Sequence, residues 1–143
     1  MNEPKDTYHI AVKLLLRKGD ELLITHDIFK EWDIPGGRIK PDEFEKPLED
    51  IAERKVSEEL GHYMQYSLGK PIVFFRHERI EHESKQPVRI FAVGYEATYK
   101  GGDIILGDNH DKYEWVNVKT FKPESYFTGG WLKGLQEYLK NQR

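Results

Sequence analysis

The sequence has no cysteine among its 143 residues, so it can form neither a disulfide framework nor a thiolate zinc site. It also lacks a basic excess, because 22 lysines and arginines face 25 aspartates and glutamates, for a formal net charge of −3. We therefore expect no nucleic-acid partner, and an anionic ligand would need positive charge or a metal at its own site. No apolar run approaches membrane-spanning length and no signal-like segment precedes the first expected strand, so we expect a cytoplasmic protein without a membrane partner.

What is present fits one globular domain over residues 1–143. Hydrophobic residues make up 38% of the chain and charged residues 33%, and the length suffices for a single core. Period-two or continuous apolar patterns predict strands over residues 8–16, 21–25, 66–80, 86–99 and 104–106. The first two should form a hairpin around residues 18–20, and the strand 8–16 reads as a central strand covered on both faces, while a turn is expected at 100–103.

The most informative stretch runs from Trp32 to Gly61. A short strand at 32–34 ends in the turn 35–37, whose two glycines allow the backbone to approach a ligand closely. From residue 47 to 60, apolar residues recur at helical spacing. Pro47 suits the first turn of this helix and Gly61 suits its C-terminal cap. A second amphipathic helix is expected at 129–140, with one apolar face formed by Trp131, Leu132, Leu135, Tyr138 and Leu139.

Two adjacent carboxylates on the first helix suggest a metal site. Glu58 and Glu59 lie roughly 100° apart around the helix axis. With carbonyls of the Gly36-Gly37 turn they would offer hard oxygen ligands for Mg²⁺. The alternative is that Arg54–Glu58 and Lys55–Glu59 are surface pairs four residues apart, which contribute only about 0.2–0.5 kcal/mol each.

Taken together, these residues resemble the signature of the Nudix hydrolases: Gly, five residues, Glu, seven residues, Arg-Glu, an aliphatic residue, one residue, Glu-Glu, one residue, Gly. The Trp-Asp-Ile-Pro-Gly-Gly run before them is typical of the family's entry strand. The resemblance extends to most of the chain and implies an α/β (α+β) fold, an α/β/α sandwich with a mixed β-sheet. It also implies hydrolysis of a nucleoside diphosphate linked to another moiety, with Mg²⁺ or alternatively Mn²⁺. The residues that fit the motif are Gly37, Glu43, Arg54, Val56, Glu58, Glu59 and Gly61.

The chain departs from this signature in two places. Ten residues separate Glu43 from Arg54 instead of seven, and Lys55 stands where the family has the Glu that usually helps to hold metal or the attacking water. An ammonium can supply positive charge there but cannot coordinate Mg²⁺. In the family, the first Glu pairs with the motif Arg and braces the loop on the helix, so we expect a Glu43–Arg54 contact. If the extra residues precede that position, Lys46 takes it instead, and the alternative role for Glu43 is a solvated loop charge.

Further site residues come from the flanking segments. Arg38, directly after the glycines, could hold a phosphate through two parallel hydrogen bonds. The segment 108–116 resembles the late Nudix loop, which implies Asn109 as a metal ligand and His110 as the base that activates water. The alternative is that His110 only caps the loop. Arg54 and Glu59 complete the catalytic set that the resemblance implies.

Within the family, the pattern resembles in part that of the GDP-mannose mannosyl hydrolases. Those enzymes also lack the Glu after the motif Arg, read Gly-Gly-Arg at the turn and use a histidine in the late loop, features found here at Lys55, residues 36–38 and residues 109–110. Two features depart from that group, because Glu58 is present and Ala11 occupies the place of an early acidic ligand. A nucleotide sugar of the GDP-mannose or ADP-ribose type is the substrate class that these features favour.

Three other patterns were weighed. His77 and His82 are five residues apart, whereas a zinc-protease helix needs a spacing of four, so a zinc protease is rejected. The segment Phe74 to Arg76 could wall a pocket, although core packing is the simpler role for its two phenylalanines. His26 is expected to be a loop histidine.

A non-enzymatic alternative is a Nudix-fold module that binds a nucleotide and regulates a partner. Homodimers are common among similar proteins.

Overall fold

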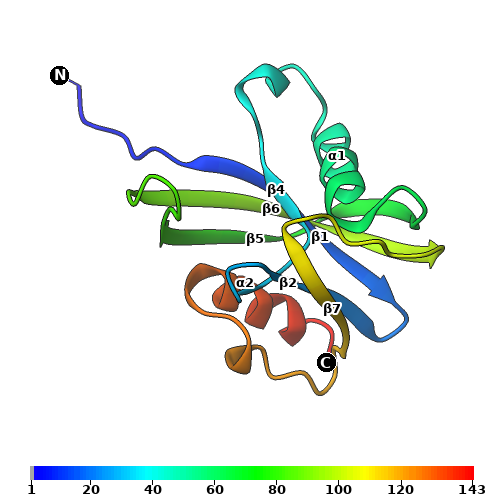
Figure 1. Cartoon of the computed structure of the whole chain (residues 1–143). Helices are drawn as coiled ribbons and strands as arrows, with labels where there is room; N and C mark the ends of the chain where they lie inside the picture. The colour runs from blue at the N-terminus through cyan, green and yellow to red at the C-terminus, as the bar shows by residue number, and fades with distance from the viewer. Residues whose placement is uncertain (1) are drawn as a thin grey trace.

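The structure is a computed structural model that describes residues 2–143. It contains a seven-stranded mixed sheet and two α-helices, arranged as Figure 1 shows. Short 3₁₀ turns occupy Pro41–Glu43 and Pro123–Ser125. The strands and helices are β1 (His9–Lys18), β2 (Glu21–Asp27), β3 (Trp32–Asp33), β4 (Gly36–Arg38), α1 (Leu48–Leu60), β5 (Gln65–Ile80), β6 (Pro87–Gly101), β7 (His110–Asn117) and α2 (Gly129–Lys140).

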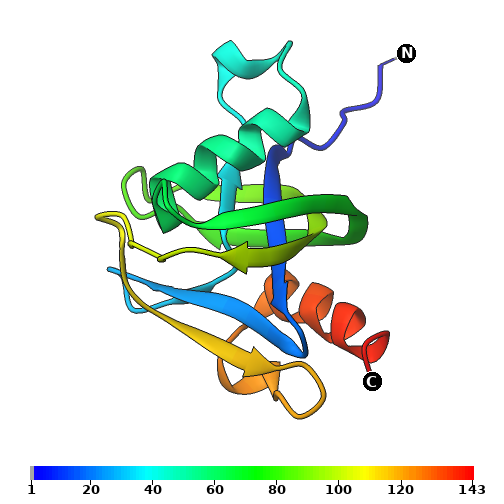
Figure 2. The ribbon, with the colours of Figure 1, turned by 90° about the vertical axis from the view of Figure 1, so that its right-hand side faces the viewer.

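Strand β1 runs through the middle of the fold, with α1 on one side of the sheet and α2 on the other (Figure 2). Every residue from 11 to 16 is buried, which confirms a central strand covered on both faces. Its side chains alternate between two cores. Ala11 and Leu15 pack in the core beneath α2, whereas Val12, Leu14 and Leu16 pack in the core beneath α1. The run AVKLLL is apolar on both faces, apart from Lys13, because each face is covered by its own helix.

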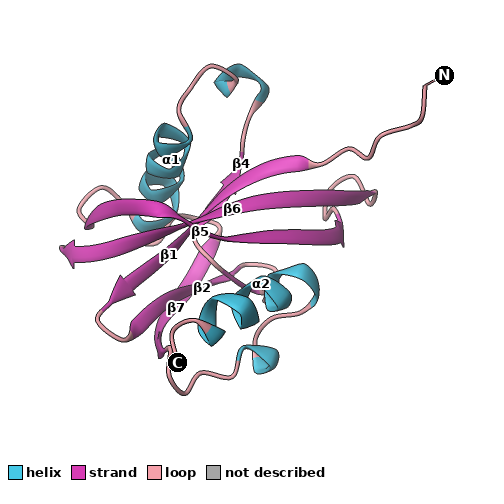
Figure 3. Cartoon of the chain, turned by 180° about the vertical axis from the view of Figure 1, so that it is seen from behind, coloured by secondary structure: helices cyan, strands magenta, loops and turns pink. Residues whose placement is uncertain are grey.

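The predicted hairpin of β1 and β2 forms, but the two strands soon part. They pair in antiparallel register only at Arg17–Leu22 and Lys18–Glu21. Beyond that point β1 pairs with β4 over residues 11–13 and, in parallel, with β6 over residues 9–17. Strand β2 pairs instead with β3 and β7. This divergence, visible in Figure 3, places β4 directly beside the central strand. The turn predicted over residues 35–37 is therefore wrong for its two glycines: the chain bends at Pro35, and Gly36 and Gly37 pair with β1 as part of β4.

The strand predicted at 104–106 is wrong. This segment is irregular, and its backbone bonds to the end of α1: Ile105 N donates to Leu60 O at 3.0 Å and Gly107 N donates to Glu59 O at 3.1 Å. Ile104 and Leu106 pack partly buried against the core beneath α1. The apolar side chains that suggested a strand therefore serve to cover a helix end. The turn expected at 100–103 is also wrong, because β6 continues to Gly101 and residues 102–103 are irregular.

Both predicted helices are confirmed. Helix α1 begins at Leu48, so Pro47 is its N-cap and does not lie within the first turn, where we expected it. Gly61 ends the helix with a φ of 87°, a value that favours glycine. Helix α2 spans 129–140 as predicted, and its apolar face lies on the sheet with Leu135, Tyr138 and Leu139 buried. Within residues 2–143, no helix is long and apolar enough to cross a membrane.

Candidate active site

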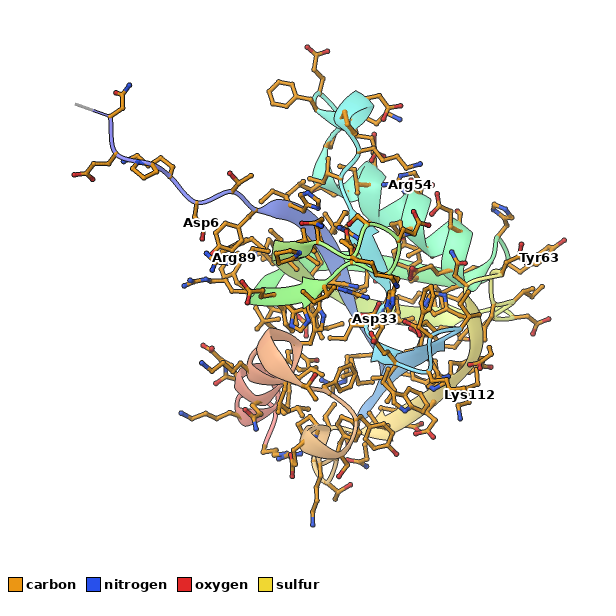
Figure 4. The ribbon with its side chains drawn as sticks, turned by 60° about the vertical axis from the view of Figure 1, so that its left-hand side comes forward. Asp6, Asp33, Arg54, Tyr63, Arg89 and Lys112 are labelled. Carbon is orange, nitrogen blue, oxygen red and sulfur yellow. The ribbon has the colours of Figure 1, made fainter. Side chains whose placement is uncertain are left out.

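A pocket of about 230 Å³ opens where β1, β4, the end of β2 and the start of α2 meet. Its polar lining combines four basic side chains with three acidic ones, and two tryptophans supply aromatic faces. In Figure 4, Asp33 lies between α1, which carries Arg54, and the layer that contains α2. The lining residues are Ala11, Lys13, Asp27, Glu31, Trp32, Asp33, Gly36, Gly37, Arg38, Lys55, Arg79, Ile90 and Trp131.

Lys13 is a buried ammonium on the central strand. Its Nζ donates to Asp33 Oδ1 at 3.0 Å and to Ile34 O at 3.1 Å, and lies 5.0 Å from the ring centroid of Trp131. A buried charge needs such partners to offset its lost hydration. Sequence reasoning did not select Lys13 as a site residue. Its signal was a lone lysine inside an otherwise apolar strand, which is unusual for a residue whose charge is costly to bury.

Glu59 links α1 to β4. Its carboxylate is buried, and its Oε1 accepts a hydrogen bond from the backbone N–H of Gly36 at 3.0 Å. Burial raises the pKa of Glu59; the charge of Asp33 also raises it, while Lys13, the Gly36 N–H and Lys55 act in the opposite direction. The net effect is a raised pKa, so additional positive charge near this carboxylate would stabilise its ionised form.

Glu58 is more exposed and is held by two cations of its own helix. Arg54 Nη1 donates to Glu58 Oε1 at 3.2 Å, and Lys55 Nζ donates to Glu58 Oε2 at 3.0 Å. Partial burial raises the pKa of Glu58, but the hydrogen bonds and charges of these two residues outweigh it, so the net pKa is lowered. Lys55 Nζ also lies 3.7 Å from Glu59 Oε2. The helical ion pairs weighed as an alternative are thus both present.

The expected contact between Glu43 and Arg54 is present. Arg54 Nε donates to Glu43 Oε2 at 2.6 Å and its Nη2 donates to Glu43 Oε1 at 2.7 Å, while Lys40 N donates to the same Oε1 at 2.8 Å. These bonds, that of Arg54 above all, lower the pKa of Glu43. Glu43, and not Lys46, therefore takes the motif position, and the longer loop is fastened to α1 by a two-pronged ion pair. Arg54 Nη2 also donates to Arg38 O at 3.2 Å, and this bond links α1 to the end of β4.

Arg38 lines the pocket, but its guanidinium already has a carboxylate partner. Both terminal nitrogens bond to the carboxylate of Glu81, at 3.2 Å for Nη2 to Oε2, and Nη1 lies 2.9 Å from His9 Nδ1. Glu81 sits at the turn between β5 and β6, a contact that no local pattern reveals. The two-pronged bond predicted for a phosphate is made to Glu81 in this structure.

The late loop lies beside the site without lining it. Asn109 and His110 are not among the described residues that line the pocket. His110 pairs with Asp27, which does line it, and Ile28 N donates to Asn109 O at 3.0 Å. Among residues 2–143, the buried Nδ1 of His110 has no hydrogen-bond partner. The roles of these two residues as base and metal ligand stay predictions.

Four aromatic or histidine candidates lie elsewhere. Phe75 is buried in the core, as its simpler role requires, whereas Phe74 is 59% exposed, so core packing is wrong for it. Neither is among the described residues that line the pocket. His77 stacks on Trp131 and accepts a hydrogen bond from Gly130 N at 3.0 Å, while His82 stacks on Phe29.

Whether the site can hold a divalent cation depends on its oxygen donors. Glu58 and Glu59 direct one oxygen each toward the same point, now occupied by Lys55 Nζ. Mg²⁺ is commonly held by one or two carboxylates together with phosphate and water. Within residues 2–143, no three His, Asp or Glu side chains gather into a metal-binding group. The donor set therefore fits a cation that shares its coordination with a bound phosphate, and does not form a closed protein site.

Comparisons with known proteins identify the family and the fold. The family model for the NUDIX domain matches residues 7–132. The solved MutT protein from Methanosarcina mazei Go1 is 21% identical, with a TM-score of 0.72 over 99% of both chains. An ADP-ribose pyrophosphatase from Streptococcus suis 89-1591 is 14% identical, with a TM-score of 0.62 over 96% of this chain and 93% of that one.

The dihydroneopterin triphosphate pyrophosphohydrolase of E. coli is 13% identical, with a TM-score of 0.66 over 95% of this chain and 99% of that one. No curated protein matches the sequence. Structural likeness at these identities establishes a shared fold. Because the domain match spans most of the sequence, and because Arg54, Glu58 and Glu59 occupy the helix that their spacing predicts, the chain belongs to the Nudix hydrolase family.

Proposed function

We propose that the protein hydrolyses a nucleoside diphosphate linked to another moiety, with Mg²⁺ or Mn²⁺ held by Glu58 and Glu59 together with the diphosphate. The observation that supports this most directly is a pocket with four basic side chains, one of which, Lys55, contacts the carboxylates of both Glu58 and Glu59. Lys13, Arg38 and Arg79 line the pocket, and the Gly36 N–H orients the carboxylate of Glu59 at its edge. When bound, the metal would neutralise charge that develops on the leaving phosphate.

The chain's own residues would divide the remaining work. Lys13, fixed by Asp33, provides a positive charge that costs little reorganisation when an anion arrives. Trp32 and Trp131 offer aromatic faces for a base or sugar. Arg38 would bind phosphate by exchanging Glu81 for it. His110 is our candidate for activating water and would have to reach the pocket past Asp27, with which it pairs.

A nucleotide sugar is the substrate that we favour. The Gly-Gly-Arg turn and the Asn-His pair of the late loop support a GDP-mannose type, and the fold shared with an ADP-ribose pyrophosphatase keeps an ADP-ribose type equally in view. Both ligands carry two phosphates between two ring systems. The pocket has the matching parts, with basic side chains beside aromatic ones.

The test is a product screen on purified protein with Mg²⁺ or Mn²⁺, using GDP-mannose, ADP-ribose, other nucleotide sugars and nucleoside triphosphates. Free sugar plus nucleoside diphosphate would mean attack at carbon, and two monophosphates would mean attack at phosphorus. Glu59→Gln should lower the rate by about 10²–10³-fold or more without unfolding the chain, because the amide oxygen can still accept from Gly36. Glu53→Gln removes an exposed charge from the same helix and should leave turnover unchanged.

Two observations favour a second function, a nucleotide-binding module with little hydrolysis. Lys55 replaces a motif carboxylate and bonds to Glu58, and Arg38 is held by Glu81. Such a module should melt at a higher temperature with a nucleotide ligand yet release no product. A folded protein that gives no turnover with any substrate of the screen, yet melts at a higher temperature with a nucleotide, would support this second function in place of the first.

A further inference from the structure

Three charged side chains of α1 meet at one point beside Gly36 and Gly37 of β4. Lys55 Nζ is 3.0 Å from Glu58 Oε2 and 3.7 Å from Glu59 Oε2. The second oxygen of each glutamate is already bound, that of Glu58 by Arg54 and that of Glu59 by Gly36 N. The two oxygens left over therefore face the same cation, and that cation is the ammonium of Lys55.

The absence of a side chain at Gly37 leaves room for the Lys55 stem. A Cβ atom on Gly37 would lie 2.4 Å from Lys55 Cε, 2.9 Å from its Cδ and 3.0 Å from its Nζ. The stem thus fills the space that any other residue at position 37 would occupy. Only 21% of the Lys55 side chain is exposed, so the ammonium lies within the site and does not extend into solvent.

We propose that Lys55 is a resident cation that occupies the divalent-metal position of the ligand-free protein, so that a metal ion reaches Glu58 and Glu59 only by displacing the ammonium. An ammonium satisfies the same carboxylates by charge and hydrogen bonds, but it cannot share the position with a second cation. Because it is tethered to the same helix, it competes at a high effective concentration. The inference rests on the proposed function in that these glutamates are taken as the metal-facing pair.

The experiment is a Mn²⁺ titration of ligand-free protein, followed by the electron paramagnetic resonance signal of the free ion. Wild-type protein should bind Mn²⁺ weakly. Lys55→Met keeps the stem and removes the charge, and should tighten binding at least tenfold. Lys55→Glu adds a third carboxylate and should tighten it further. Lys140→Met removes a charge from the exposed last turn of α2 and should match wild type.

Equal Mn²⁺ affinity in wild type and in folded Lys55→Met would overturn the proposal. If thermal unfolding shows that Lys55→Met is not folded, Lys55→Gln provides the same comparison with a polar side chain. The readout does not depend on turnover. Tighter metal binding in the variants with no hydrolysis of any substrate would defeat the proposed function alone, whereas hydrolysis with unchanged affinities would defeat this inference alone.

Discussion

Replacing Gly36 by alanine should destabilise the protein far more than replacing its neighbour Gly37. Gly36 has a φ of 141°, and a Cβ there would lie 2.0 Å from Val12 O and 2.8 Å from Lys13 Cα, both backbone atoms of the central strand. Backbone strain of this kind costs about 1–3 kcal/mol and overpacking a further 1–3 kcal/mol, so we expect a loss of roughly 2–6 kcal/mol. At about 2–4 °C per kcal/mol, the melting temperature should fall by roughly 4–24 °C.

At Gly37 the same substitution meets only the Lys55 side chain, whose flexible stem can move aside. We expect a loss of about 1 kcal/mol or less, and a melting temperature within about 4 °C of wild type. Thermal unfolding followed by circular dichroism, at one protein concentration and in EDTA, measures both variants. The reasoning is refuted if Gly36→Ala melts within a few degrees of wild type, or if Gly37→Ala melts as low as Gly36→Ala.

Two further predictions concern the motif loop and α2. Glu43→Gln should lower stability at pH 7, and because Arg54 and Lys40 N hold the pKa of Glu43 below its ordinary 4.5, that difference should shrink as the pH falls below this value; urea midpoints of wild type and variant converging only above pH 7 would contradict it. Gly134→Ala should destabilise the protein by about 1–2 kcal/mol, because the new Cβ would lie 2.1 Å from Cδ1 of buried Phe75. This loss should exceed the roughly 1 kcal/mol gain in helix propensity. A higher urea midpoint for the variant would contradict this prediction and show that the Phe75 ring moves to make room.

Local pattern was sufficient where a residue's partner lies close in sequence or in a fixed motif. The helix 48–60 and its cap at Gly61 follow from apolar spacing and glycine chemistry. The Glu43–Arg54 pair follows from the motif even with a longer loop, because the loop can bulge while its charged end stays bound to the helix. These features depend on interactions within about twenty residues.

Pattern failed where the partner comes from a distant segment. Glu81 reaches Arg38 only because the turn after β5 folds over β4. The apolar segment 104–106 has strand-like composition, yet its amides bond to the carbonyl end of α1. Lys13 became recognisable as a site residue only when Asp33 and Trp131 were seen around it. In each case the deciding contact joins residues about twenty or more positions apart.

The parallel pairing of β1 with β6 also sets the order in which the molecule can assemble. Synthesis of β4 and α1 is complete by residue 60. Strand β6, which pairs with the other edge of β1, is made only when residues 87–101 are translated. Contacts of such long sequence separation slow folding, because a large loop must close before they form. During synthesis, the segment that carries the site therefore waits, with one edge of its supporting strand unpaired, for a strand that is translated several seconds later. Growth at low temperature or with added chaperone should raise the yield of native protein for this reason.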